Sequence, residues 1–206
     1  MTRVTIDGAA RVAALARADQ PAEAALEVAS FVYPHIHAGE YLGRLDTMAA
    51  RVEGAGHLAL RRVVAIAEGL GGNVDDYYHP DNSFLNRVLD TRRGIPITLS
   101  VIWIEVGRRA GLEMEGVGLP GHFLVYASGQ LVDPFHGGEA IGFEEAAALV
   151  AESLGGKPRL DRRWLEPVST VEIVARLVRN LDQVYRARGE LHHLAWVEAC
   201  REAVET

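Results

Sequence analysis

The segment that decides the fold is GIPITLSVIWIEVGRRAG, residues 94–111. Pro96 stands where a helix can begin, because proline is favoured in the first helical turn. The next two turns are apolar on nearly every side, and a helix without a polar face is typically buried. Gly111 provides the signal for its end. We therefore expect a buried central helix over residues 97–110.

A β-hairpin is predicted after this helix and a short strand at residues 114–119. The sequence GHFLVYASGQLVDPF, residues 121–135, contains two apolar, β-prone runs around the turn signal ASGQ. If those four residues form the loop, Tyr126 pairs with Leu131, and His122 pairs with Phe135.

The same register places His122 and Asp133 on one face of the hairpin, as diagonal neighbours whose side chains can hydrogen-bond. Such a carboxylate fixes the imidazole tautomer, as in the orienting half of a catalytic triad. A buried hydrogen bond with a purely structural role is the alternative, and spacing alone does not separate the two. The single cysteine, Cys200, lies far along the sequence, and we interpret it as a packing residue.

The rest of the chain is mainly helical by pattern. Caps, glycine and proline signals and apolar periodicity predict helices at residues 7–18, 21–33, 41–48, 57–70, 82–89, 143–154, 169–188 and 190–205. Residues 158–167 are predicted to form a linker. We therefore divide the chain into a core with an N-terminal helical region, residues 1–160, and a C-terminal helical hairpin, residues 161–206.

Charge, apolar runs and motifs argue against several classes of function. The chain has 206 residues and a formal net charge of −7, which argues against general nucleic-acid binding. We see no secretory signal and no apolar run long enough to cross a membrane, so we expect a cytoplasmic protein. His35 and His37 lack a third ligand nearby in sequence, and no phosphate loop or dinucleotide fingerprint is present. We predict no metal and no cofactor.

Several segments together resemble one bacterial family. They are residues 75–86, 92–100, 116–125, 132–138 and 175–181. They are similar to the SirB-type family, in which a transglutaminase-like core precedes a tetratricopeptide-like helical tail. The resemblance covers about residues 25–190. It implies an α+β fold with a papain-like core, in which a buried central helix packs on a small antiparallel sheet.

The resemblance also assigns roles to residues. In active transglutaminase-like enzymes the nucleophilic cysteine stands at the N-terminus of the central helix, and a His and an Asp come from adjacent strands. His122 and Asp133 fall on the latter two positions, and the cysteine position falls at or beside Pro96. Proline has neither a nucleophilic atom nor an N–H. The resemblance therefore predicts a domain without thiol catalysis.

Two functions follow from these expectations. The first is a protein- or peptide-binding module that uses the retained cleft. Asn82, Asn86 and Arg93 lie just before the central helix in sequence, so with Pro96 they are expected to line a groove at its N-terminus, unless the first three only hold the preceding loop.

The second function is a hydrolase or amidase-like enzyme. Ser100 or Thr98, in the first turns of the central helix, would then be the nucleophile, with His122 as base and Asp133 as its orienting partner. Hydroxyl groups in a first helical turn more commonly satisfy backbone groups. The oligomeric state is not predicted.

Overall fold

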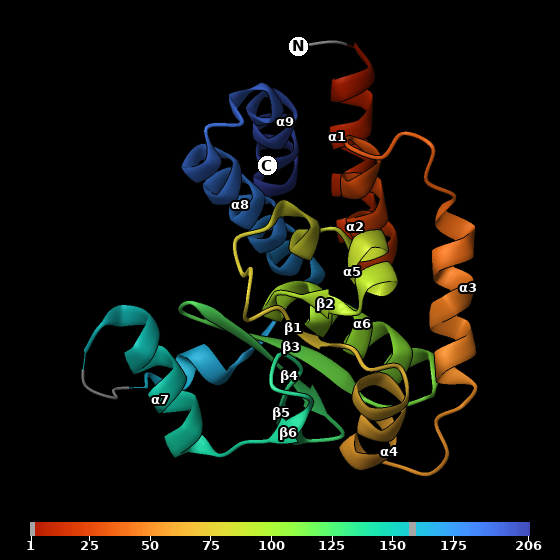
Figure 1. Ribbon diagram of the computed structural model, residues 1–206, viewed down its shortest axis with the longest axis vertical. Helices are drawn as coiled ribbons and strands as arrows, with labels where there is room; N and C mark the ends of the chain where they lie inside the picture. The colour runs from red at the N-terminus through yellow and green to blue at the C-terminus, as the bar shows by residue number, and fades with distance from the viewer. Residues whose placement is uncertain (1–2, 157–159) are drawn as a thin grey trace.

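The computed structural model describes residues 3–156 and 160–206 (Figure 1). The α-helices are α1 (Arg3–Arg17), α2 (Pro21–Ser30), α3 (Ala38–Ala49), α4 (His57–Arg61), α5 (Leu85–Thr91), α6 (Pro96–Arg109), α7 (Phe143–Leu154), α8 (Thr170–Arg188) and α9 (Leu194–Glu205). The strands are β1 (Gly71–Gly72), β2 (Arg93–Gly94), β3 (Met114–Leu119), β4 (His122–Ala127), β5 (Gln130–Asp133), β6 (Glu139–Ala140) and β7 (Pro167–Val168). This mixture confirms the predicted α+β class.

Helix α6 is the centre of the molecule. Every residue from Pro96 to Gly107 is buried, as the apolar pattern of the segment predicts. One side of α6 contacts β3 and β4, and other sides contact α2, α3, α5 and α8. The remaining elements are therefore arranged around this one helix.

The main sheet is antiparallel and has the strand order β6-β5-β4-β3-β7. Side chains of β4 alternate between its two faces. Phe123 and Val125 join the large core that contains α6. Leu124 instead joins a smaller cluster with Ala146 and Val150 of α7. The sheet thus separates α6 from α7.

The β4–β5 hairpin has the predicted register, with Tyr126 opposite Leu131. Its loop is two residues shorter than predicted because Ala127 pairs with Gln130. Ser128 and Gly129 have φ values of 51° and 78°, as a type I′ turn requires.

The predicted strand pair between His122 and Phe135 is not formed, because β5 ends at Asp133 and the chain turns away. The two rings still lie near each other, with centroids 6.0 Å apart.

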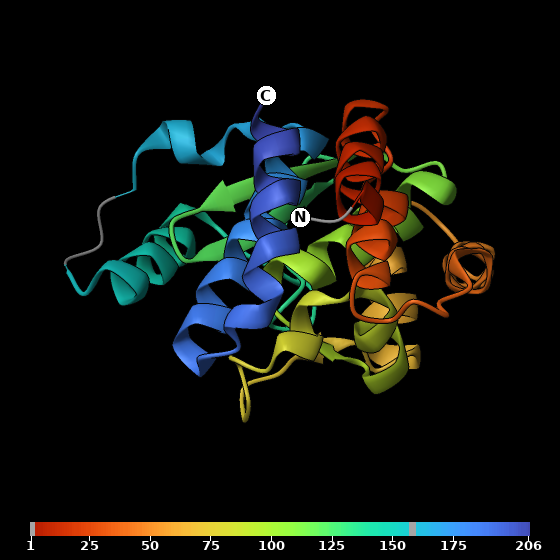
Figure 2. The same ribbon diagram turned by 90° about the horizontal axis from the view of Figure 1, so that it is seen from above.

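The N-terminal and C-terminal helices form a layer over α6. Helix α9 lies beside α1 and α8 in both views (Figures 1 and 2). Buried residues as far apart in sequence as Ala9 and Val204 belong to one hydrophobic cluster. The division near residue 160 stays a prediction, and residues on both sides of it share this core.

Two predicted segments differ in detail. The helix predicted over residues 57–70 begins as α4 and continues as a π-helix, Arg62–Ala67. The predicted linker contains a 3-10 helix, Arg162–Leu165, and strand β7, which pairs with β3, while residues 157–159 lie outside the described ranges. A two-residue strand at a sheet edge leaves too little alternation in the sequence to be recognised.

The turn after β5 depends on two adjacent glycines. Gly137 and Gly138 have φ values of 74° and 71°. A Cβ atom at Gly138 would lie 2.0 Å from Cη2 of buried Trp103, whereas one at Gly137 has no heavy atom within 4 Å. The turn therefore packs directly on α6 through Gly138.

This contact gives a matched pair of substitutions. We expect Gly137→Ala to lower the free energy of unfolding by about 1–2 kcal/mol, from left-handed backbone strain alone. Gly138→Ala should lower it by about 1–3 kcal/mol more, because it also overpacks the Trp103 ring. Urea denaturation of both variants measures the difference, and equal losses would contradict the packing argument.

Candidate functional site

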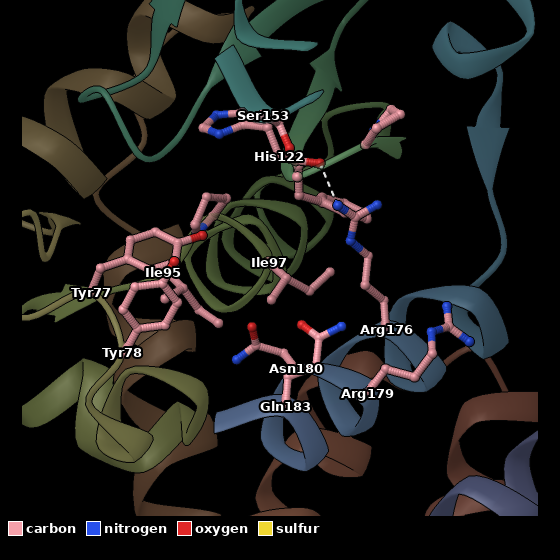
Figure 3. A pocket seen from close by; sticks show the side chains of 14 residues that line it. Tyr77, Tyr78, Ile95, Ile97, His122, Ser153, Arg176, Arg179, Asn180 and Gln183 are labelled. Carbon is pink, nitrogen blue, oxygen red and sulfur yellow. Dashed lines mark hydrogen bonds between the residues drawn. The ribbon is translucent and has the colours of Figure 1, made fainter. Parts of the chain in front are cut away.

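A pocket of about 520 Å³ opens beside the N-terminus of α6. Its walls come from four regions: the loop before residue 80, the start of α6, the β3–β4 turn and α8, and Ser153 of α7 adds to its rim (Figure 3). The described residues that line it are Tyr77, Tyr78, Ile95, Pro96, Ile97, Pro120, Gly121, His122, Phe123, Ser153, Arg176, Arg179, Asn180 and Gln183.

The predicted hydrogen bond between His122 and Asp133 is present. His122 Nε2 lies 2.8 Å from Asp133 Oδ2, and the two residues are 8% and 1% exposed. The other carboxylate oxygen, Oδ1, accepts from the backbone N–H groups of Phe135 and His136 at 2.9 and 3.3 Å. Asp133 is therefore fixed by the turn that follows it, and it fixes the His122 ring in turn.

His136 is a member of this group that the sequence prediction missed. Its Nδ1 lies 2.8 Å from the same oxygen, Asp133 Oδ2, and its ring stacks near that of His122 with centroids 5.8 Å apart. The signal in the sequence was the spacing of three residues after Asp133. Ligand atoms of His122, Asp133 and His136 lie within 4.8 Å of one another, so the three together offer a ligand set for a metal ion.

The two imidazoles determine the charge state of Asp133. Burial by itself raises the pKa of this carboxyl, but the hydrogen bonds and charges of His122 and His136 outweigh it, and the pKa of Asp133 is lowered. The carboxylate is thus ionised at neutral pH although it is buried.

Pro96 lines the pocket together with His122, at the first position of α6. The chain's only cysteine is elsewhere: Cys200 is fully buried in α9, where burial, followed by the charge of Glu27, raises the pKa of its thiol to about 12. Neither residue supplies a thiolate to the pocket.

Thr98 and Ser100 are placed away from the pocket. Both are 0% exposed and neither is among its lining residues. Their hydroxyl groups have no hydrogen-bond partner within the described ranges. Ser153, which sequence reasoning did not select, does line the pocket, and a Cβ atom at Gly121 would lie 1.7 Å from its Oγ.

Three residues expected at the cleft are not among its described lining. The Asn82 amide binds the backbone carbonyls of Asp76 and Tyr77, so it holds the preceding loop. Asn86 is buried in α5 and borders a different hollow of the surface. Arg93 is exposed, and its guanidinium donates to the carbonyls of Gly69 and Arg92. Asn82 and Arg93 thus bond to local backbone groups, which is the alternative that the sequence left open, whereas Asn86 Oδ1 has no hydrogen-bond partner within the described ranges.

Helix α8 supplies functional candidates that the sequence prediction did not select. Arg176 donates through Nη2 to the carbonyl oxygen of Leu119. The same nitrogen donates to the carbonyl oxygen of His122 at 2.9 Å, the bond drawn in Figure 3. Asn180 and Gln183 follow on the same wall of the pocket. Their spacing of three to four residues along a helix is the available signal.

The sequence matches the family described as Transglutaminase-like superfamily over residues 39–179, which is more than half of the 206 residues. The chain belongs to the transglutaminase-like superfamily. The matched range includes α6, the sheet and two of the four α8 residues that line the pocket, Arg176 and Arg179. This match identifies the superfamily and does not distinguish the SirB-type family within it.

Known relatives of this transglutaminase-like chain include bacterial UPF0162 proteins. One from Xylella fastidiosa is 45% identical over 134 residues, which is 62% of this chain and 48% of that protein. One from Pseudomonas aeruginosa is 34% identical over 119 residues, covering 56% of this chain and 44% of that protein. F-box only protein 21 of Mus musculus is 43% identical over 54 residues, or 26% and 9% of the two chains.

This transglutaminase-like chain thus covers less than half of the length of these bacterial relatives. No solved structure gives a significant match. None of the helices in the described ranges combines the length and apolar composition that a membrane crossing requires.

The network around Asp133 predicts a stability difference between two substitutions. Asp133→Ala should lower the free energy of unfolding by about 1–3 kcal/mol, because it leaves buried donors of His122 and Phe135 unpaired. His136→Ala removes a side chain that is 55% exposed, so we expect a loss below about 1 kcal/mol. Urea denaturation at neutral pH measures both, and a larger loss for His136→Ala would show that the network is described wrongly.

Proposed function

We propose that this transglutaminase-like domain binds a protein or peptide segment in the pocket beside α6 and performs no thiol chemistry. The observation that carries this proposal is that Pro96 lines the same pocket as His122, whose ring is bonded to Asp133. The resemblance puts a nucleophilic cysteine at or beside that position. The orienting half of a triad is kept, and the atom that would attack a substrate is missing.

The dimensions and the walls of the pocket support a binding role. A volume of about 520 Å³ lies in the range of ligand-binding clefts. Tyr77 and Tyr78 lie on one side, and Arg176 lies on the opposite side (Figure 3). Aromatic side chains and arginine are the residue types enriched where proteins bind partners.

An enzyme that uses a hydroxyl nucleophile has less support. Thr98 and Ser100 are fully buried outside the pocket lining, so neither hydroxyl is accessible to a substrate there. Fluorophosphonate labelling that disappears in Ser100→Ala or Ser153→Ala, or turnover of an ester or amide that His122→Ala abolishes, would contradict the binding proposal.

We also propose that the α8–α9 hairpin corresponds to part of the tetratricopeptide-like tail of SirB-type proteins. Helix α8 begins with a capping box at Ser169 and Glu172, and it packs against α9. Under the proposed division at residue 160, the pocket would take one wall from each unit, since Arg176 and His122 both line it.

The binding proposal predicts the effect of filling the pocket. An immobilised array of short peptides of varied sequence is probed with the labelled 206-residue chain. We expect a subset to bind, and Gln183→Trp to weaken that binding about tenfold or more, because the indole occupies pocket volume.

Ala187→Trp is the matched control, since it adds the same side chain to an exposed position of α8 outside the pocket lining. It should leave peptide binding unchanged. An array with no bound peptide, or equal losses in the two variants, would overturn the binding proposal.

Replacing Pro96 tests the missing nucleophile directly. In Pro96→Cys the new thiol stands in the first turn of α6, where the helix dipole lowers a thiol pKa. We expect this variant to react with iodoacetamide at neutral pH, whereas Cys200 of the unmodified chain stays unreactive because burial raises its pKa to about 12. Pro96→Ala is the control, and a Pro96→Cys protein no more reactive than it would show that this position is not the nucleophile position.

A further inference from the structure

Arg176 is a partly buried cation with neutral partners. Its described hydrogen bonds go to the carbonyl oxygens of Leu119 and His122, and no carboxylate pairs with it within the residues that the structure describes. Both bonds use Nη2, which leaves the N–H groups of Nη1 and Nε. A buried charge is costly unless an opposite charge accompanies it.

Burial distinguishes Arg176 from Arg93, which also donates only to carbonyl oxygens among the described residues but is exposed. Burial lowers the pKa of Arg176, and the nearby charge of Arg179 lowers it further. At Arg87, by contrast, a hydrogen bond of 3.0 Å to Asp81 raises the pKa. Arg176 is thus held near the pocket by backbone carbonyls without the carboxylate that stabilises a typical arginine.

The rest of the pocket is also suited to an anion. Its described lining contains two arginines and no aspartate or glutamate, in a chain with a formal net charge of −7. Arg179 pairs with Glu205 at 3.2 Å, but this pair is about half exposed and therefore weak. Asp133 is near the pocket but its oxygens are occupied by His122, His136 and the following turn.

Further donors lie around Arg176. The hydroxyl-bearing rings of Tyr77 and Tyr78 lie across the pocket from it (Figure 3). The N-terminus of α6, which carries the positive end of the helix dipole, forms part of the floor through Pro96 and Ile97. The N-cap residue of α6 is Ile95, whose apolar side chain cannot accept a hydrogen bond from the helix.

We propose that the pocket binds the side-chain carboxylate of a glutamate or aspartate in the partner peptide, with Arg176 as the cation that pairs with it. This inference rests on the proposed peptide-binding function and names the chemistry that the bound segment must present. The carboxylate would form an ion pair with the Arg176 guanidinium. The rings of the two tyrosines would contact the neighbouring part of the peptide.

The first test compares two small probes, N-acetyl-glutamate methylamide and N-acetyl-glutamine methylamide. They differ only in the carboxylate, and neither has a charged terminus. Nitrogen-15 NMR of the full chain should show shifts at Ile97, at His122 and at the Arg176 Nε–H on titration with the glutamate probe. Its affinity should exceed that of the glutamine probe about tenfold or more, since hydrogen bonds to charged groups are the stronger ones.

Variants then assign the effect to Arg176. Arg176→Gln should abolish the preference for glutamate over glutamine, and Arg176→Lys should keep part of it. Arg93→Gln is the matched control, because Arg93 also donates only to carbonyl oxygens among the described residues but lies outside the pocket lining. It should leave the preference unchanged. The comparison of the two probes on the unmodified chain needs no variant, so it decides the matter even if Arg176→Gln fails to fold.

Three outcomes overturn the inference: equal affinity for the two probes, shifts confined to residues outside the pocket, or inorganic phosphate binding there as tightly as the glutamate probe. The peptide array separates this inference from the proposed function. If peptides without acidic residues bind and Gln183→Trp weakens their binding, the carboxylate inference is wrong while the peptide-binding proposal stands. An array with no bound peptide would remove both.

Discussion

The burial of α6 from Pro96 to Gly107 is the constraint on which the rest of the structure depends. A fourteen-residue helix without a polar face needs partners on every side, and the chain provides them from the sheet and from helices on both sides of it in sequence. The leading N–H groups of such a helix have no partner within the helix, so its first turn must face side chains, solvent or a ligand that can accept hydrogen bonds. The first turn of α6 borders the pocket, and Pro96, which has no N–H, leaves one fewer donor there.

The site follows from this arrangement. The β3–β4 turn brings His122 to the end of α6, the turn after β5 brings Asp133 and His136 behind it, and α8 closes the opposite wall. The arrangement places the hydrogen-bonded His122–Asp133 pair beside Pro96, a residue without a nucleophilic atom. His122 of this pair lines a pocket of about 520 Å³, and this pocket is the basis of the proposed binding function.

Much of the fold could be predicted from the sequence. Apolar periodicity and caps predicted α6, α7 and α8 to within one or two residues. The turn signal between the two apolar runs predicted the register of the hairpin, and a shift of one residue would have moved Leu124 and Leu131 to the other face. The His122–Asp133 bond followed from that register. The features that the sequence analysis did not predict correctly were a very short strand and the length of a turn. Strand β7 is two residues long, and the loop of the hairpin was shortened by a turn type that requires two positive φ angles.

The site was predicted less completely for a physical reason. Asn82, Asn86 and Arg93 are near the helix start in sequence, but local backbone groups and packing occupy them. Arg176 is more than fifty residues from His122, and only the folded chain brings its guanidinium to the carbonyl of that histidine. Because this arginine joins α8 to the β3–β4 turn, the two cannot separate without exposing a cation and two carbonyl groups together. In hydrogen-exchange terms, amides around the turn and along the middle of α8 would then share one opening reaction and form a single cooperative unit.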